Sequence, residues 1–126
     1  MSRKIGITAC SNPMRPSFSA DLARLCQILQ ELGFEPVLSP CLYDNGSGFS
    51  GTGAERAAAL MNLYRDPEIT DIFDISGGDM ANEVLPYLDF SVIAASGKRF
   101  CGYSDLTTIV NAITAATGNE SMLYQV

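Results

Sequence analysis

The 126 residues are 47% hydrophobic and 17% charged, with a mean hydropathy of +0.13. This composition is typical of one compact globular domain and excludes a disordered or fibrous chain. The net charge is −6, and the eight Lys and Arg residues are scattered along the chain. We therefore expect neither nucleic acid nor an anionic membrane as a partner.

The sequence contains no recognisable metal-binding motif and no export signal. The four cysteines form no C-x-x-C pair and the chain has no histidine, so we expect free thiols, no zinc site and no cofactor. The apolar stretch 5–10 after Arg3-Lys4 is too short for a signal peptide or a membrane span. These features predict a cytoplasmic protein.

The first half of the chain predicts two strands and two helices. Residues 4–9 form the first strand and residues 35–39 the second. Between them, Ser19 can cap an amphipathic helix that Gly33 ends. After a flexible loop at 44–51, Thr52 and Glu55 have the spacing of a capping box, and the helix they open ends at Asp66-Pro67.

The second half continues the alternation. Residues 69–75 and 99–103 are expected strands, and 83–88 and 90–95 are expected short helices. A last helix, capped by Ser104 or Asp105, runs to Thr117, and 122–126 begin another strand.

Strands that alternate with helices at short intervals predict an α/β domain over 1–126, with a doubly wound, mostly parallel sheet and helices on both faces. Ligands of such sheets bind beyond the carboxyl ends of the strands. Three loops are expected at that edge: 10–17, 76–82 and 102–105. All three carry small or polar residues suited to contact with a ligand.

The loop 76–82 has the layout of a strand-to-helix elbow that presents a nucleophile. Gly77 and Gly78 allow a sharp turn and leave backbone N–H groups free to face a ligand. A serine at the apex would be exposed beside donors for an oxyanion. Ala81 occupies that place in this sequence.

Four segments, in order along nearly the whole chain, resemble the N-terminal half of the LD-carboxypeptidase family, which includes murein tetrapeptide carboxypeptidases and microcin C immunity proteins. They are Ile7-Thr8-Ala9 with Pro13; 51–58 through 66–69; Gly77-Gly78 followed by 85–89; and 102–107. The resemblance implies a flavodoxin-like or class I glutamine amidotransferase-like fold. It also implies cytosolic, homodimeric serine hydrolases that cleave the amide bond between an L-centre and a D-residue of murein peptides.

Mapped onto this sequence, the resemblance places the nucleophile position at Ala81 and the oxyanion donors at the backbone N–H groups of Gly78 and Asn82. Substrate contacts are expected from Gly77, Asp79, Tyr103, Ser104 and Asp105. The resemblance assigns the catalytic histidine and glutamate to a C-terminal domain that this sequence does not contain. We therefore predict a peptide or muropeptide ligand and no peptidase activity from this chain alone.

Simpler interpretations compete with these roles. Ser76 is a turn former, Ser104 and Asp105 favour helix capping over ligand contact, and Tyr103 suits the core as well as the site. Cys10 lies near the site without a visible activating base. For the whole chain, Ala81 also permits a module that binds muropeptides without cleaving them. A nucleotide-binding domain is less favoured, because neither glycine-rich phosphate motif occurs.

Overall fold

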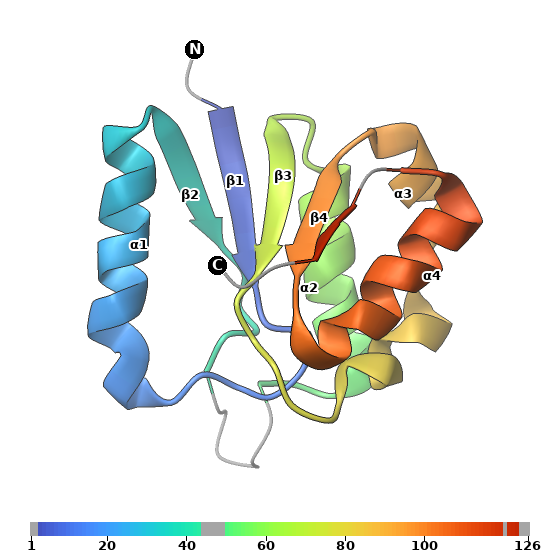
Figure 1. The fold of residues 1–126 in the computed structure, drawn as a ribbon, viewed down its shortest axis with the longest axis horizontal. Coiled ribbons are helices and arrows are strands. Elements are labelled where there is room, and N and C mark those ends of the chain that lie inside the picture. Colours follow the sequence, from blue (N-terminus) through green and yellow to red (C-terminus); the bar gives the residue numbers. More distant parts are fainter. Residues whose placement is uncertain (1–2, 44–49, 120, 124–126) are drawn as a thin grey trace.

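A single parallel sheet organises the chain, which the computed structural model describes over residues 3–43, 50–119 and 121–123. Its strands are β1 (Arg3–Thr8), β2 (Phe34–Leu38), β3 (Ile69–Asp74), β4 (Arg99–Gly102) and β5 (Ser121–Leu123). They lie in the order β2-β1-β3-β4-β5, and all four neighbouring pairs are parallel (Figure 1). The predicted doubly wound α/β sheet is confirmed, and its strand order is that of flavodoxin-like folds.

Helices cover both faces of this sheet. They are α1 (Ser19–Glu31), α2 (Gly53–Arg65), α3 (Phe90–Ser96) and α4 (Thr107–Thr117). The smaller core lies between α1 and residues such as Ile5 and Ile7 of β1. The larger core lies on the other face, where α2, α3 and α4 pack against Ile72 and Phe100. Each crossover thus buries its apolar side against the sheet.

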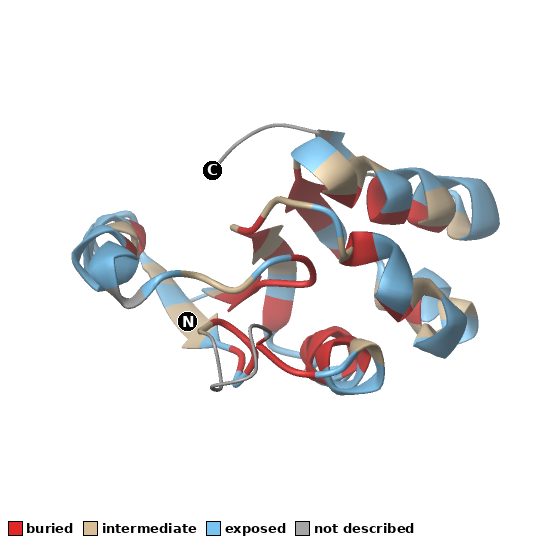
Figure 2. Cartoon of the chain, turned by 90° about the horizontal axis from the view of Figure 1, so that it is seen from below, coloured by how far each residue is buried: buried red, intermediate tan, exposed pale blue. Residues whose placement is uncertain are grey.

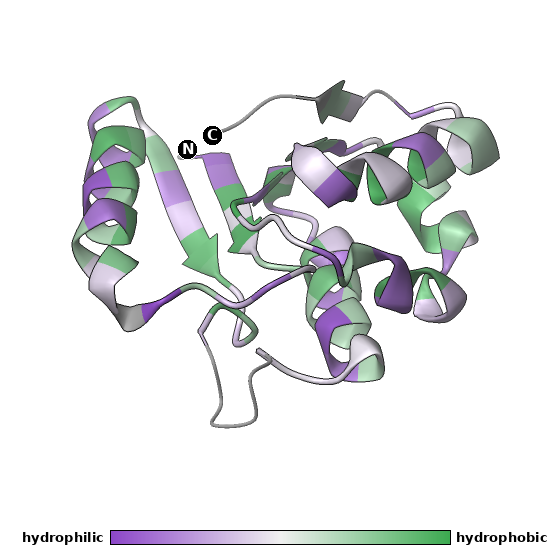
Figure 3. Cartoon of the chain, turned by 60° about the horizontal axis from the view of Figure 1, so that its bottom comes forward, coloured by the Kyte–Doolittle hydropathy of each residue, from purple (hydrophilic) through white to green (hydrophobic). Residues whose placement is uncertain are grey.

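The two faces are buried to different extents. Helix α2 has seven buried residues, five of them in the larger core, whereas the buried residues of α1 are Leu22 and Leu29. Figure 2 shows this contrast as a largely red α2 and a largely pale blue α1. Hydrophilic and hydrophobic colours alternate along α1 in Figure 3, as expected of a helix with one apolar stripe.

Local sequence signals explain several boundaries. The Thr52 hydroxyl accepts from the Glu55 N–H at 3.1 Å, and the Glu55 carboxylate accepts from the Thr52 N–H at 3.0 Å, so the predicted capping box is confirmed. Pro36 lies in β2, which is an edge strand, where a missing N–H is tolerated.

Two expected features need correction. Ser19 is not the cap of α1, because a 3-10 turn at Pro16–Phe18 leads directly into the helix. The short helix expected at 83–88 is a 3-10 helix, Ala81–Tyr87, which contains Pro86. Of the last predicted strand, residues 124–126 lie outside the described residues, as do residues 44–49 of the predicted loop.

The strand order places the candidate site. The chain runs from β1 outward to β2 and then crosses to β3 on the other side of β1, so the direction of winding reverses between β1 and β3. Loops diverge at such a point and leave a crevice beyond the strand ends. The N–H of Asn12, after β1, donates to the carbonyl of Gly77, after β3, at 3.3 Å.

Candidate active site

The most unusual backbone at this edge belongs to Ser104. Its φ is 59°, and it is the one residue other than glycine with a positive φ in the described part of the chain. A left-handed conformation costs an ordinary residue about 1–2 kcal/mol. Ser104 is exposed, lies two residues after the end of β4 and begins the 3-10 turn Ser104–Leu106 that continues into α4. A strained, exposed serine between a strand and a helix is the geometry of a nucleophile elbow.

Gly102 permits this sharp turn. A Cβ at Gly102 would lie 3.0 Å from the Cβ of Leu106, a tight contact, so glycine favours close packing of the strand end on the following turn. The same requirement places glycine two residues before the serine in G-x-S-x-G elbows. The sequence Gly102-Tyr103-Ser104 therefore matches the first half of that motif, and Leu106 stands where the motif has its second glycine.

The glycine pair after β3 lies opposite Ser104. A Cβ built at Gly77 would lie 3.6 Å from Ser104 Oγ and 3.6 Å from the Tyr103 hydroxyl. These atoms are therefore neighbours across a narrow gap, although they come from two different strands. The backbone N–H groups of Gly77, Gly78 and Asp105 donate no hydrogen bond to another described residue. All three belong to residues that form this gap or are next to them in the sequence. The predicted grouping of Gly77, Tyr103 and Ser104 is thus present.

Gly78 packs against the loop that follows β1. Its φ is +136°, and a Cβ there would overlap the Asn12 side chain at 2.2 Å from Cγ. The Asn12 carboxamide oxygen also accepts from the Asp79 N–H at 3.4 Å. Glycine is required at position 78 for both its φ and this close contact.

A line of hydrogen bonds joins the three loops at the strand ends. The Ser76 hydroxyl donates to Asp74 Oδ1 at 2.5 Å and accepts from the Ser11 N–H at 3.1 Å. The Ser11 hydroxyl donates to Asp105 Oδ2 at 2.7 Å, and the same oxygen accepts from the Ala81 N–H at 2.9 Å. The loops after β1, β3 and β4 are therefore hydrogen-bonded to one another, which favours a pre-organised site.

Asp74, at the end of β3, anchors this line from inside the protein. It is fully buried and also accepts from the Cys10 N–H at 2.8 Å and the Ser76 N–H at 2.9 Å. Burial raises the pKa of its carboxyl, while the hydrogen bonds from Ser76 and Cys10 oppose the shift. Burial and the neighbouring Asp74 raise the pKa of the Cys10 thiol well above its usual value, the opposite of an activated nucleophile.

Arg56 of α2 is completely buried behind the loops, with 1% of its surface exposed. Its guanidinium donates to the carbonyls of Gly51 at 3.1 Å, Cys10 at 2.5 Å and Met80 at 3.0 Å, and it pairs with the Glu83 carboxylate. A charged residue in the first turn of a helix is by default exposed or part of the cap, so the sequence did not single out Arg56. One signal was available: Arg56 is four residues before the buried Leu60, on the inward face.

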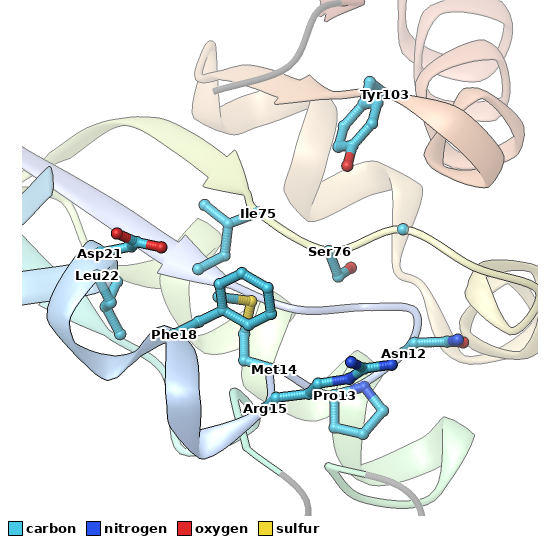
Figure 4. Close-up of a pocket in the computed structure, with 11 residues that line it drawn as sticks. Asn12, Pro13, Met14, Arg15, Phe18, Asp21, Leu22, Ile75, Ser76 and Tyr103 are labelled. Carbon is cyan, nitrogen blue, oxygen red and sulfur yellow. The ribbon is translucent and has the colours of Figure 1, made fainter.

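A cavity of about 650 Å³ adjoins the Ser104 gap on the α1 side. Its lining is partly apolar and partly polar, and Gly77 and Tyr103 line it as well as the gap. Figure 4 shows the Tyr103 hydroxyl directed toward Ser76 across the cavity, with Arg15 and Asn12 on one side and Asp21 on the other. A ligand at Ser104 can therefore extend into a space that offers apolar contact and both signs of charge.

The surroundings of Ala81 argue against its predicted place at the apex of the elbow. Its exposed fraction is 0%, its side chain belongs to the larger core, and its N–H is held by Asp105. A hydroxyl at this position would meet the core rather than the gap. The Gly77-Gly78 turn is present, but it lies across the gap from the exposed Ser104 and does not itself present a nucleophile.

Other predicted roles also change. Asn82 and Asp79 are both exposed, and no recorded contact brings either one to Ser104. Neither Ser104 nor Asp105 caps α4, because Leu106 precedes that helix and no side chain caps it. The Asp105 carboxylate instead holds Ser11 and Ala81.

Two further features complete the description. Across the described ranges, no cluster of three or more His, Cys, Asp or Glu side chains is arranged to hold a metal ion. Over the same ranges, no helix is both long and apolar enough to cross a bilayer.

The sequence matches a known domain over almost its full length. Residues 5–124 match the family described as LD-carboxypeptidase N-terminal domain. The Escherichia coli microcin C7 self-immunity protein MccF is 36% identical over 114 residues, which cover 90% of this chain and 33% of that protein. A probable murein peptide carboxypeptidase of Bacillus subtilis is 33% identical over 114 residues, covering 90% of this chain and 35% of that protein.

Solved structures agree with this match. A MccF-like protein from Bacillus anthracis superposes with a TM-score of 0.89 at 29% identity, covering 98% of this chain and 38% of that one. MccF in complex with aspartyl sulfamoyl adenosine gives a TM-score of 0.79 at 34% identity, covering 94% of this chain and 35% of that one. The chain spans about a third of the length of these relatives.

Proposed function

Because the chain belongs to the LD-carboxypeptidase family through its N-terminal domain, we propose that it supplies the nucleophile and the oxyanion site of a serine hydrolase. The substrates proposed are murein peptides or related peptide conjugates with an amide bond between an L-centre and a D-residue. The observation that carries this proposal is the positive φ of the exposed Ser104 in the turn between β4 and α4.

In the proposed reaction the Ser104 hydroxyl attacks the amide carbonyl, and the negative charge that develops on the carbonyl oxygen is held by backbone N–H groups. The donors proposed are the N–H of Asp105, directly after the nucleophile, and an N–H of the Gly77-Gly78 loop opposite. No hydrogen bond from these N–H groups to another described residue is recorded, so they are available to a ligand. Each such donor contributes about 3–4 kcal/mol to transition-state stabilisation in well-studied hydrolases.

The general base is proposed to lie outside these 126 residues. The sequence contains no histidine, and within the described part of the chain the Ser104 hydroxyl has no recorded hydrogen-bond partner. A serine needs an adjacent base to become a nucleophile at neutral pH. This requirement supports the prediction that these residues alone do not hydrolyse peptides. The other reason for that prediction, an alanine at the nucleophile position 81, does not fit the burial of Ala81.

The cavity beside Gly77 and Tyr103 is proposed to receive the part of the substrate next to the cleaved bond. MccF has been solved with an aminoacyl sulfamoyl nucleoside bound, which supports a small peptide-like or nucleotide-like conjugate as an alternative to a muropeptide. A homodimeric assembly and a cytoplasmic location are further parts of this proposal.

The test uses the full reading frame in which these residues occur. A tetrapeptide ending in an L,D-amide bond is supplied, and the release of its terminal D-amino acid is followed with a D-amino acid oxidase assay. Ser104→Ala should lower turnover on the order of a million-fold, whereas Ala81→Ser should not raise it. The proposal fails if Ser104→Ala retains the wild-type rate. An enhancement by Ala81→Ser would instead support position 81 as the site of the nucleophile.

A further inference from the structure

Two peptide units at the site are held at both ends. In the Cys10–Ser11 unit, the carbonyl accepts from Arg56 Nη1 at 2.5 Å and the N–H donates to Ser76 Oγ at 3.1 Å. In the Met80–Ala81 unit, the carbonyl accepts from the same Nη1 at 3.0 Å and the N–H donates to Asp105 Oδ2 at 2.9 Å. One nitrogen of a buried side chain thus orients two peptide planes in different loops.

The second of these units leads directly to the nucleophile. Asp105 is the neighbour of Ser104, and its Oδ2 also accepts from the Ser11 hydroxyl at 2.7 Å. The first unit carries Ser11 itself. Both routes from Arg56 therefore converge on one carboxylate oxygen, which fixes the residue that follows Ser104.

A contribution to the stability of the fold does not by itself explain why a buried arginine occupies position 56. Removing a guanidinium from water costs several kcal/mol, and well-packed apolar side chains often replace buried ion pairs without loss of stability. Its ion-pair partner, Glu83, is 48% exposed, so the pair gains only part of the Coulomb energy of a buried pair. The geometry that an apolar side chain cannot reproduce is the simultaneous donation to carbonyls of three loop segments, at Cys10, Gly51 and Met80.

We propose that Arg56 is a positioning residue for hydrolysis at Ser104. Through the Cys10–Ser11 and Met80–Ala81 peptide units it sets the separation between the Gly77-Gly78 loop and the Ser104 turn, where the oxyanion is stabilised. The role rests on the proposed function, since it concerns the rate of that reaction. It predicts that Arg56 affects the rate of turnover more than the binding of the substrate.

The first experiment compares Arg56→Lys with Arg65→Lys, a matched control on the exposed end of the same helix, in the full reading frame. Reactive serines are counted by titration with a serine-directed phosphonate, so that kcat is expressed per active site. Arg56→Lys should lower kcat per active site about 10- to 100-fold, with KM within about threefold of the wild type. Arg65→Lys should match the wild type.

A purely structural role predicts a different result. Fewer serines would then be titrated, but each would turn over at the wild-type rate, and that outcome overturns the proposal. Ser104→Ala is measured in parallel: if it is inactive while Arg56→Lys has wild-type kcat per site, only the role of Arg56 is wrong. If Ser104→Ala is active, the proposed function fails first.

The second experiment does not depend on activity. Amide hydrogen exchange of the protein made from the full reading frame is followed at Ser11 and Ala81, the two N–H groups of these peptide units. In Arg56→Lys both should exchange about tenfold faster than in the wild type and in Arg65→Lys, while amides of β1 and β3 keep their protection. Unchanged exchange at both positions overturns the proposal, and the lysine avoids the unfolding expected of Arg56→Ala.

Discussion

At the scale of single residues, the variant Gly77→Ala tests how narrow the gap in front of Ser104 is. A methyl group there would lie 3.5 Å from Ser104 Cβ and 3.6 Å from Ser104 Oγ, which are ordinary contact distances. Gly77→Ala should therefore fold with a free energy of unfolding within about 1 kcal/mol of the wild type. In the proposed reaction, however, the methyl would narrow the gap in front of Ser104 that receives the substrate, so kcat/KM should fall about 100-fold. Urea titration and the D-amino acid release assay measure the two effects.

Gly78→Ala is the contrasting variant. Its Cβ would overlap Asn12 at 2.2 Å, and its φ of +136° disfavours any side chain. It should lower the free energy of unfolding by about 1–3 kcal/mol as well as the activity. If Gly77→Ala is the more destabilising of the two, the described path of this loop is wrong.

Asp74 gives a prediction about pH. Burial raises the pKa of its carboxyl above the ordinary value of 3.8, so the folded state holds this proton at a pH where the unfolded state has released it. Stability contributed by this group therefore increases as the pH falls from neutral toward 3.8 and decreases as the pH rises through the folded-state pKa. Asp74→Asn removes the titrating group. The stability of the wild type relative to Asp74→Asn should increase on acidification, as measured by urea unfolding at several pH values; the opposite slope would contradict a raised pKa.

At the scale of elements, the start of α2 determines where Arg56 lies. The capping box of Thr52 and Glu55 fixes the first turn, and Arg56 is the next residue. Thr52→Ala removes the acceptor for the Glu55 N–H and should lower the free energy of unfolding by about 1 kcal/mol. Thr108→Ala, an exposed position inside α4, serves as the control and should change it by less than about 0.5 kcal/mol. Equal effects in urea titrations would show that the cap is unimportant.

The sheet acts at the same scale, because its order brings three loops to one edge. The reversal of winding between β1 and β3 opens the crevice, and β4 beside β3 places Tyr103 and Ser104 against Gly77. The elements thus create a site from residues that are 27 positions apart in the chain, as the numbering of Gly77 and Ser104 shows.

At the scale of the whole molecule, the absence of histidine from the sequence sets the limit of what the chain can do. The 126 residues expressed alone should unfold in one cooperative transition but should not release D-amino acids, whereas the protein made from the full reading frame should release them. Circular dichroism during thermal unfolding checks the first expectation and the release assay the second. Hydrolysis by the isolated chain that Ser104→Ala abolishes would show that a base other than histidine is present within it.

Much of the fold was predictable because its causes are local. The capping box at Thr52 and Glu55, for example, depends only on a four-residue spacing. The alternation of strands and helices was sufficient for a parallel sheet. The ordered resemblance over 7–107 was likewise enough to predict the family, which the match over 5–124 confirms.

The site was predictable only in part. The sequence by itself determined the loops that meet at the sheet edge and the presence of Gly77, Tyr103, Ser104 and Asp105 in them. The sequence could not distinguish the turn at 76–82 from the turn at 102–105, because both carry glycine and small residues. It favoured Ala81 as the nucleophile position. The tertiary structure decided between them, because burial and φ are properties of the packed chain: Ala81 is enclosed by the core, and Ser104 is held exposed at a φ of 59°. The role of Arg56 could not be predicted for the same reason, because its three carbonyl partners become neighbours only when α2 packs behind the loops.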